Sequence, residues 1–431
     1  MDRFVIKGGV PLQGSVRIRG AKNSFTKLMV ASLLTEESVT LTNCPSTIEM
    51  DLMCEMLGNI GAKVSAVKKG VVVVQASHIR NYRVSSQSRK NRIPILALAP
   101  LLHRKGKAEV PYLGGDAIGA RPVNFHLDIL RKMGARIVIK KDTYEAQARR
   151  LHGTRLVLPY PSVGATETAL FAAVLAEGKT VIENAAGEPE IIDLISMLQK
   201  MGALIELDVN RVIRIEGVKK LRGASHRVMP DRMEAASFAI LAIATNGNVL
   251  VEDARQEHMI TFLNAIRRIG GEYRVEEKGI RFFRKNGTLL PSDIETQPHP
   301  GFMSDWQQPF TVLLMLARGH SRVHETVYED RFGFVKEFVR LGALIEISTK
   351  CFGRPCRFAN KGFPHSIEIR GPSRLKGADI TVPDIRAGLA HLVAALTAKG
   401  ISTISGVEHL DRGYEKIDQR LRSIGANIKR I

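Results

Sequence analysis

Six basic residues occur in polar clusters where a helix or strand is expected to end, rather than on an exposed helix face. They are Lys22, Arg92, Arg121, Arg331, Arg386 and Arg412. Guanidinium groups bind carboxylates and phosphates through paired hydrogen bonds, so this many cations suit a substrate that carries both groups. Several of these arginines have an aspartate close by in the sequence. Any single Asp–Arg pair of this kind is more often a structural ion pair than part of a catalytic site.

Two of these clusters have features of ligand-binding loops. The run Gly20–Ser24 (GAKNS) places Lys22 and Asn23 between a strand and an apolar helix, where a lysine and backbone amides can hold an anion. The run Gly114–Val123 (GGDAIGARPV) has three glycines within six residues and carries Asp116 and Arg121. Glycine permits tight turns, so we expect a mobile or tightly turned loop near residues 113–123. The alternatives are that Lys22 simply faces solvent and that the run at 114–123 is an ordinary surface loop.

Further motifs join carboxylates or arginines to turn residues at similar boundaries. They are SVGAT at 162–166, ENAAGEPEIID from 183, PDRMEA from 230, PHPGFMSDWQQPF around Asp305, ETVYEDRF ending at Arg331, PDIRA containing Asp384 and Arg386, and HLDRGYE containing Arg412.

The elements that must position these residues repeat six times. A Gly-Ala or Gly-Gly pair follows an amphipathic stretch at Gly61, Gly134, Gly202, Gly270, Gly342 and Gly425, at spacings of 73, 68, 68, 72 and 83 residues. A glycine directly after an apolar-periodic stretch predicts the end of a helix. Each repeat also contains an apolar stretch, a turn and a short β-branched run.

The repeats predict an α/β fold in two domains of three repeats, because units of this length are too long for a solenoid, whose repeats span about 20–50 residues. We expect one domain at 21–229 and the other at 1–20 plus 230–431. The strand-like segments 4–6 and 16–18 would then complete the last repeat.

Composition limits the possible partners and location. The chain has 431 residues, 44% of them hydrophobic, and no apolar run approaches the roughly 20 residues of a membrane span. It has only four cysteines and starts with no secretory signal, which favours the cytoplasm. The formal net charge of +20 permits anionic partners, including nucleic acid. A generally basic surface is the simpler explanation.

The last repeat is lengthened by an insertion-like segment, Cys351–Ser366. Cys351, Cys356 and His365 could form part of a metal site. Two thiols at a loose spacing are weak support, so we predict a surface loop and no metal.

With these motifs in view, the chain resembles the UDP-N-acetylglucosamine 1-carboxyvinyltransferases along its whole length. GAKN, GARPV, SVGAT, ENAAGEPEI, PDRMEA, PHPGFMSD, ETVYEDRF and HLDRGYEKI stand in the family's order and spacing. The resemblance implies two lobes of three βαβαββ-like repeats, an inside-out α/β barrel. It also implies transfer of the enolpyruvyl group of phosphoenolpyruvate to the 3-hydroxyl of UDP-N-acetylglucosamine, the first committed step of peptidoglycan synthesis. No cofactor or metal is implied, and neither a nucleic acid nor a membrane partner is expected.

The resemblance also implies residue roles. Lys22, Arg121 and Arg412 resemble the cations that hold the phosphate of phosphoenolpyruvate, with Asn23 close by. Arg331 and Arg386 resemble the partners of its carboxylate, and Asp305 the base near the attacking hydroxyl. Sugar-nucleotide contact positions are Asn23, Arg92, Arg121, Pro122, Val123, Asn124, Phe125, Tyr160, Ser162, Val163, Asp305 and Val327.

Three positions depart from the family pattern. Asp116 stands where the usual loop residue is cysteine, and we interpret it as the general acid. An ordinary aspartate is ionised at neutral pH whereas a thiol is protonated, so this role requires a raised pKa. Fosfomycin alkylates that cysteine, so we expect an insensitive enzyme. Ile48 and Tyr160 replace lysines that usually serve phosphate or nucleotide binding.

Those replacements leave other functions open. One alternative is an enolpyruvyl transferase with another acceptor, as in nucleoside antibiotic synthesis, and another is a paralogue with impaired catalysis. A 3-phosphoshikimate 1-carboxyvinyltransferase is disfavoured by the GAKN motif and the GARPV loop. RNA binding or RNA 3′-phosphate cyclisation is disfavoured because the chain has no aromatic RNA-binding motif.

Overall fold

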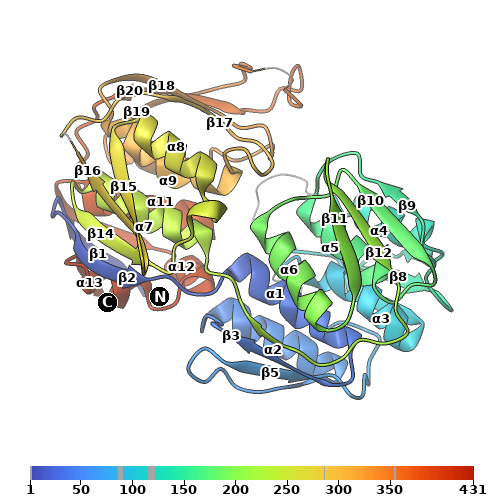
Figure 1. Cartoon of the computed structure of the whole chain (residues 1–431). Coiled ribbons are helices and arrows are strands. Elements are labelled where there is room, and N and C mark those ends of the chain that lie inside the picture. Colours follow the sequence, from blue (N-terminus) through green and yellow to red (C-terminus); the bar gives the residue numbers. More distant parts are fainter. Residues whose placement is uncertain (1, 86–90, 115–121, 286, 354–355) are drawn as a thin grey trace. The chain divides into compact units, whose positions relative to one another are not determined.

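The computed structural model describes residues 2–85, 91–114, 122–285, 287–353 and 356–431. Contacts divide the chain into two compact units. The terminal unit contains the N-terminal residues up to Arg19 together with Pro230–Ile431, and the central unit contains the described residues from Gly20 to Met229. In Figure 1 the terminal unit is dark blue and yellow to red, and the central unit is blue to green.

Three sheets make up the described strands of the terminal unit, in the orders β21-β22-β1-β23, β15-β16-β14-β2 and β17-β18-β20-β19. The strands are β1 (Phe4–Gly8), β2 (Gln13–Arg17), β14 (Asn248–Glu252), β15 (Gly271–Glu276), β16 (Gly279–Arg284), β17 (Asp293–Glu295), β18 (Gly319–His324), β19 (Leu344–Ser348), β20 (Ser366–Gly371), β21 (Asp379–Thr381), β22 (Gly400–Ser405) and β23 (Asn427–Arg430). The helices are α7 (Arg232–Ala244), α8 (Ile260–Arg268), α9 (Ser304–Leu316), α10 (Val335–Arg340), α11 (Ile385–Thr397), α12 (Glu408–Gly413) and α13 (Ile417–Arg422), with a 3₁₀ turn η4 (Gln256–His258).

The described strands of the central unit also form three sheets, in the orders β11-β12-β10-β9, β13-β3-β5-β4 and β6-β8-β7. The strands are β3 (Ser38–Thr42), β4 (Lys63–Val64), β5 (Val72–Gln75), β6 (Lys107–Pro111), β7 (Arg136–Ile139), β8 (Thr143–Gln147), β9 (Arg155–Val157), β10 (Lys179–Glu183), β11 (Leu204–Asp208), β12 (Val212–Glu216) and β13 (Ser225–Arg227). The helices are α1 (Lys22–Ala31), α2 (Ile48–Ile60), α3 (Leu98–Lys105), α4 (Asn124–Lys132), α5 (Val163–Ala173) and α6 (Pro189–Lys200), with 3₁₀ turns η1 (Ser32–Leu34) and η3 (Ile93–Ala97).

Apolar helices form the interior of each unit and the sheets lie outside them. In the terminal unit α7, α9 and α11 pack against one another, and every residue of α7 is buried. A helix that is apolar on all sides is stable only when neighbours surround it. The helices α1, α3 and α5 are largely buried in the same way in the central unit. The α/β fold class predicted from the repeats is therefore confirmed.

The amphipathic helices end where the glycines predict. Gly61, Gly134, Gly202, Gly270, Gly342 and Gly425 have φ angles between 87° and 113° and follow α2, α4, α6, α8, α10 and α13. This left-handed conformation is costly for a residue with a Cβ, so glycine is strongly preferred there.

The two N-terminal strands join different sheets. β1 pairs with β22 and β23, which confirms that the start of the chain completes the last repeat. The same expectation was wrong for the second strand, because β2 pairs in parallel with β14 in the fourth repeat. The close approach of the segments that precede β2 and β14 depends on Gly247, where a Cβ would lie only 2.1 Å from the carbonyl oxygen of Leu12.

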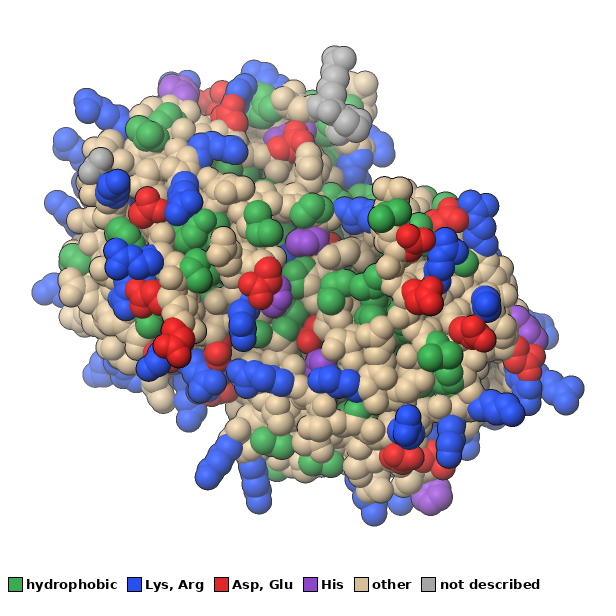
Figure 2. Space-filling model, in the orientation of Figure 1, with side chains coloured by type: hydrophobic (Ala, Val, Ile, Leu, Met, Phe, Trp, Pro, Cys, Tyr) green, Lys and Arg blue, Asp and Glu red, His purple; other side chains and the backbone are tan. Residues whose placement is uncertain are grey.

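Lys and Arg side chains are spread over the face shown in Figure 2, among scattered Asp and Glu side chains. This distribution agrees with a generally basic surface as the origin of the +20 charge. None of the helices in the described residues is long and apolar enough to cross a membrane.

Candidate active site

In the terminal unit three predicted residues meet at the start of two buried helices. Asp305 lies in the first turn of α9 and Arg386 in the first turn of α11, while Arg331 comes from the loop after β18. Arg331 Nη2 donates to Asp305 Oδ1 at 2.5 Å, and Arg386 Nε donates to Asp305 Oδ2 at 3.1 Å. One carboxylate therefore holds two buried guanidinium groups.

Both arginines remain charged. Their pKa values are raised because nearby acidic groups outweigh the effect of burial, which lowers them. Arg386 Nη1 also donates to the Tyr414 hydroxyl at 2.8 Å. Burial raises the pKa of Tyr414, so this phenol stays protonated at neutral pH. Two fixed cations with a carboxylate between them can bind an anionic substrate beside a proton acceptor.

Glu325 holds the segment that leads to Arg331. Its Oε1 accepts from the backbone N–H groups of Val327 and Tyr328 at 2.7 and 3.0 Å. Its Oε2 accepts from the Ser304 hydroxyl at 2.8 Å. Burial raises its pKa, although Arg331 and these donors oppose the shift. Glu325 thus ties the segment containing Val327 to the first turn of α9.

The remaining predicted residue of this unit, Arg412, is half-buried on α12, which packs against α11, the helix that carries Arg386. Sequence reasoning assigned no role to Glu325 or Tyr414, although both belong to quoted motifs, ETVYEDRF and HLDRGYE.

In the central unit Lys22 is the first residue of α1, followed by Asn23, and both are half-buried. Lys22 Nζ lies 3.6 Å from Oε2 of the buried Glu49. Asn91 Nδ2 donates to the other Glu49 oxygen at 2.8 Å, and Arg92 comes next in the chain. Glu49 therefore links α1 to the segment before η3. No role at the site was predicted from the sequence for Glu49 or Asn91.

A second group of predicted residues lies where α4 and α5 begin. Val123 precedes α4, Asn124 and Phe125 are its first residues, and the exposed Pro122 comes just before them. The Ser162 hydroxyl accepts from the Ala165 N–H and so caps α5, whose first residue is Val163. The two helices pack against each other.

His126 connects these helix starts. Its Nδ1 lies 2.7 Å from the Thr168 hydroxyl, and a Cβ at Gly164 would lie 2.9 Å from its Cε1. The glycine of SVGAT thus allows α5 to approach the ring. Burial, with a smaller effect of the Arg92 charge, lowers the pKa of His126 to about 3, so the ring is neutral.

Two departures from the family pattern are visible in this unit. Ile48, the first residue of α2, is 42% exposed. Tyr160 is half-buried, and its carbonyl oxygen accepts from the Ser162 N–H at 2.7 Å. Asp116 and Arg121, predicted as general acid and phosphate ligand, lie outside the described residues, as do most residues of the predicted loop at 113–123.

Glu167 provides a pH-dependent contribution to stability. It is buried on α5, 3.9 Å from Lys27 Nζ, and Lys27 also donates to the Asn23 carbonyl oxygen. Burial raises the pKa of Glu167 from 4.5 to about 7, against the opposing charge of Lys27. Its contribution to stability is therefore fully present below pH 4.5 and is lost as the pH rises through 7.

We expect Glu167→Gln to remove this loss, which amounts to about 3 kcal/mol. Thermal melts of wild type and variant at pH 5, 6, 7 and 8 should diverge, with the wild type losing more stability as pH rises. The exposed Glu206→Gln should follow the wild type. Parallel curves for wild type and Glu167→Gln would contradict the prediction.

Comparisons with known proteins identify the family. Residues 6–421 match the family model described as EPSP synthase (3-phosphoshikimate 1-carboxyvinyltransferase). The UDP-N-acetylglucosamine 1-carboxyvinyltransferase of Protochlamydia amoebophila is 44% identical over 100% of this chain and 95% of its own length. That of Chlamydia abortus is 46% identical over 98% and 96%.

Two solved structures show the same fold at low identity. The enolpyruvyl transferase NikO from Streptomyces tendae superposes with a TM-score of 0.87 at 22% identity, covering 100% of this chain and 98% of that one. EPSP synthase from Acinetobacter baumannii has a TM-score of 0.77 at 19% identity, with both chains fully covered. Together with the full-length relatives, these results place the chain in the EPSP synthase family of enolpyruvyl transferases and, within it, among the UDP-N-acetylglucosamine 1-carboxyvinyltransferases.

Proposed function

We propose that this protein transfers the enolpyruvyl group of phosphoenolpyruvate to the 3-hydroxyl of UDP-N-acetylglucosamine and releases phosphate, in the first committed step of peptidoglycan synthesis. The observation that carries the proposal is the Arg331–Asp305–Arg386 group, in which two buried cations flank one carboxylate. Full-length relatives with this activity in their names support the choice of acceptor. A cytoplasmic location belongs to the same proposal, because phosphoenolpyruvate is a cytoplasmic metabolite.

Arg331 and Arg386 are proposed to bind the carboxylate of phosphoenolpyruvate. A bound carboxylate would compete with Asp305 for the same guanidinium groups. Asp305 would then be released from its ion pairs and could accept the proton of the sugar hydroxyl. Binding of one substrate would in this way activate the base that acts on the other.

The proposed reaction is an addition followed by an elimination. The hydroxyl oxygen bonds to C2 of phosphoenolpyruvate and its proton goes to Asp305, while Asp116 protonates the methylene carbon. In the resulting tetrahedral intermediate the new methyl group returns a proton to the Asp116 carboxylate as phosphate is expelled, which restores the double bond, and Asp305 gives up its proton to solvent. Lys22, Arg121 and Arg412 are proposed to hold the phosphate, since cations stabilise the charge of the leaving group.

The remaining predicted positions are proposed to contact the sugar nucleotide: Asn23, Arg92, Pro122, Val123, Asn124, Phe125, Tyr160, Ser162, Val163 and Val327. The packing of α4 on α5 and the capping of α5 by Ser162 give several of them a fixed backbone.

Product analysis tests the proposal directly. Incubation with both substrates should yield UDP-N-acetylglucosamine that carries an enolpyruvyl ether at its 3-hydroxyl, identified by mass spectrometry and NMR. UMP in place of UDP-N-acetylglucosamine serves as the acceptor control. An unmodified sugar nucleotide together with an enolpyruvyl derivative of UMP would contradict the assigned acceptor.

The purified enzyme should also keep full activity after incubation with fosfomycin. The compound alkylates a cysteine in the family, and an aspartate carboxylate at position 116 offers no thiol. Residual activity and intact protein mass are the two measurements. Time-dependent loss of activity together with a covalent adduct would show that another residue is the target.

A further inference from the structure

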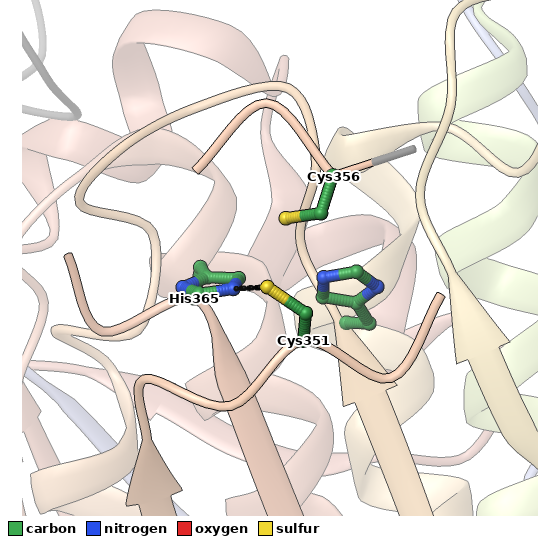
Figure 3. A group of neighbouring side chains, drawn as sticks. Cys351, Cys356 and His365 are labelled. Carbon is green, nitrogen blue, oxygen red and sulfur yellow. Dashed lines mark hydrogen bonds between the residues drawn. The ribbon is translucent and has the colours of Figure 1, made fainter. Parts of the chain in front are cut away.

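Four side chains with metal-binding atoms gather at one end of the sheet β17-β18-β20-β19. They are His324, Cys351, Cys356 and His365, and their ligand atoms all lie within 4.8 Å of one another. Figure 3 shows the Cys351 thiol facing the His365 ring, with the Cys356 side chain beside them. Cys351 Sγ is 3.3 Å from His365 Nε2, and neither cysteine is in a disulfide.

The sheet register brings these residues together. His324 ends β18 and pairs with Ser366, the first residue of β20, so His324 and His365 lie side by side, with ring centroids 5.3 Å apart. The segment between β19 and β20 then carries Cys351 and Cys356 back over this end of the sheet. It approaches so closely that a Cβ at Gly353 would lie 1.7 Å from Glu295 Oε2.

Both histidines present the same nitrogen to the cluster. His365 Nδ1 lies 2.7 Å from the Phe363 carbonyl oxygen, a hydrogen bond in which the ring must be the donor. His324 Nδ1 lies 2.9 Å from Glu295 Oε2. This arrangement leaves both Nε2 lone pairs available, and among the described residues His324 Nε2 is buried without a hydrogen-bond partner. Metal-binding histidines are held in this way, by a carboxylate or a backbone carbonyl on the opposite ring nitrogen.

From this geometry we propose that His324, Cys351, Cys356 and His365 form a binding site for one Zn²⁺ ion. Two thiolates and two imidazoles are a donor set that zinc prefers, and four protein ligands make a closed, structural site. Tetrahedral bonds to zinc would set the ligand atoms about 3.3–3.8 Å apart. Cys351 and His365 already have this separation. Because no two ligand atoms are more than 4.8 Å apart, the others need to approach by at most about 1–1.5 Å.

Binding would fix the loop that contains the two cysteines. Zinc replaces the thiol protons, which pass to solvent, and its binding energy stabilises the ordered loop. Arg357 of this loop donates to the Val327 carbonyl oxygen at 3.3 Å and lies 3.8 Å from Glu329. Through these contacts the ion would also stabilise the segment between Glu325 and Arg331. The importance of this segment for substrate binding rests on the proposed function.

Metal analysis of the full-length, tag-free protein tests the site without reference to activity. The chain should be stripped with a chelator, reloaded with Zn²⁺ and passed through gel filtration before elemental analysis. We expect one zinc per wild-type chain, and none in the Cys351→Ser/Cys356→Ser double variant. Cys54→Ser, which alters a thiol in the central unit, should retain the ion.

Cobalt substitution and a variant of Glu295, the carboxylate that contacts His324 Nδ1, provide two further tests. Co²⁺-loaded wild type should show the visible absorption of a tetrahedral centre and a thiolate-to-cobalt charge-transfer band. Glu295→Gln should weaken zinc affinity about 10–100-fold while keeping the spectrum, because Glu295 is not a ligand itself but contacts His324 at Nδ1 and so orients its ring. Trypsin should cut the loop at Arg357 or Lys361 faster after zinc removal.

Wild-type protein that retains no zinc, or that gives no thiolate band with Co²⁺, would overturn the proposal. Equal zinc content in wild type and the double-cysteine variant would also overturn it. Because none of these measurements requires turnover, failure of the zinc site and failure of the proposed enzymatic function are distinguishable.

Discussion

Asp305→Asn should lower kcat by about 10²–10⁴-fold, the usual contribution of a general base. The amide is close in shape to the carboxylate and can still accept a hydrogen bond from Arg331, but it cannot take a proton from the sugar hydroxyl. It also no longer neutralises Arg331 and Arg386, which become more available to the carboxylate of phosphoenolpyruvate. We therefore expect the KM for phosphoenolpyruvate to stay equal or fall while kcat collapses. Steady-state kinetics at saturating acceptor provide both values.

A large fall in kcat without a rise in the KM for phosphoenolpyruvate separates a catalytic role from a structural one. A variant whose helices α9 and α11 had been disturbed would bind phosphoenolpyruvate less well. A kcat within tenfold of wild type would contradict the assignment of Asp305 as the base. A rise in KM with unchanged kcat would instead assign it to substrate binding.

The second large effect is expected at position 116. Asp116→Asn should also lose about 10²–10⁴-fold in kcat, because an amide cannot supply the proton that the methylene carbon requires. Asp116→Cys restores the residue usual in the family and should recover activity. It should also become sensitive to fosfomycin, unlike the wild type. Rates of phosphate release with and without prior incubation with fosfomycin measure both properties.

The paired variants serve as each other's control. If Asp116→Asn retains activity, Asp116 is not the general acid. If Asp116→Cys is active but remains insensitive to fosfomycin, position 116 does not correspond to the family's loop cysteine. Either result would remove the main support for the proposed proton donor.

Features encoded locally could be predicted from the sequence. Six glycines after amphipathic stretches marked helix ends because a left-handed residue is a property of a short segment, and all six have positive φ. The family resemblance likewise rests on contiguous motifs. The residue roles that it implies stay predictions until the variants above are measured.

Features that depend on contacts between distant segments were predicted less well. Asp305, Arg331 and Arg386 were all named as site residues, but the ion pairs between them were not predicted. Arg331 and Arg386 lie 26 and 81 residues from Asp305; the packing of α9 against α11 brings Arg386 to Asp305, and the segment after β18 brings Arg331. The pairing of β2 with β14 was missed for the same reason. His324 was missed as a partner of the two cysteines because the register of β18 and β20, rather than chain spacing, places it beside them.

Phosphate release from phosphoenolpyruvate tests the central claim most directly. The wild-type enzyme should be assayed with UDP-N-acetylglucosamine, with UMP, and without any acceptor. We predict release that depends on UDP-N-acetylglucosamine and saturates with it, and background rates in the two controls. Release that is equally fast with UMP, or no release above background with UDP-N-acetylglucosamine, would contradict the proposed function.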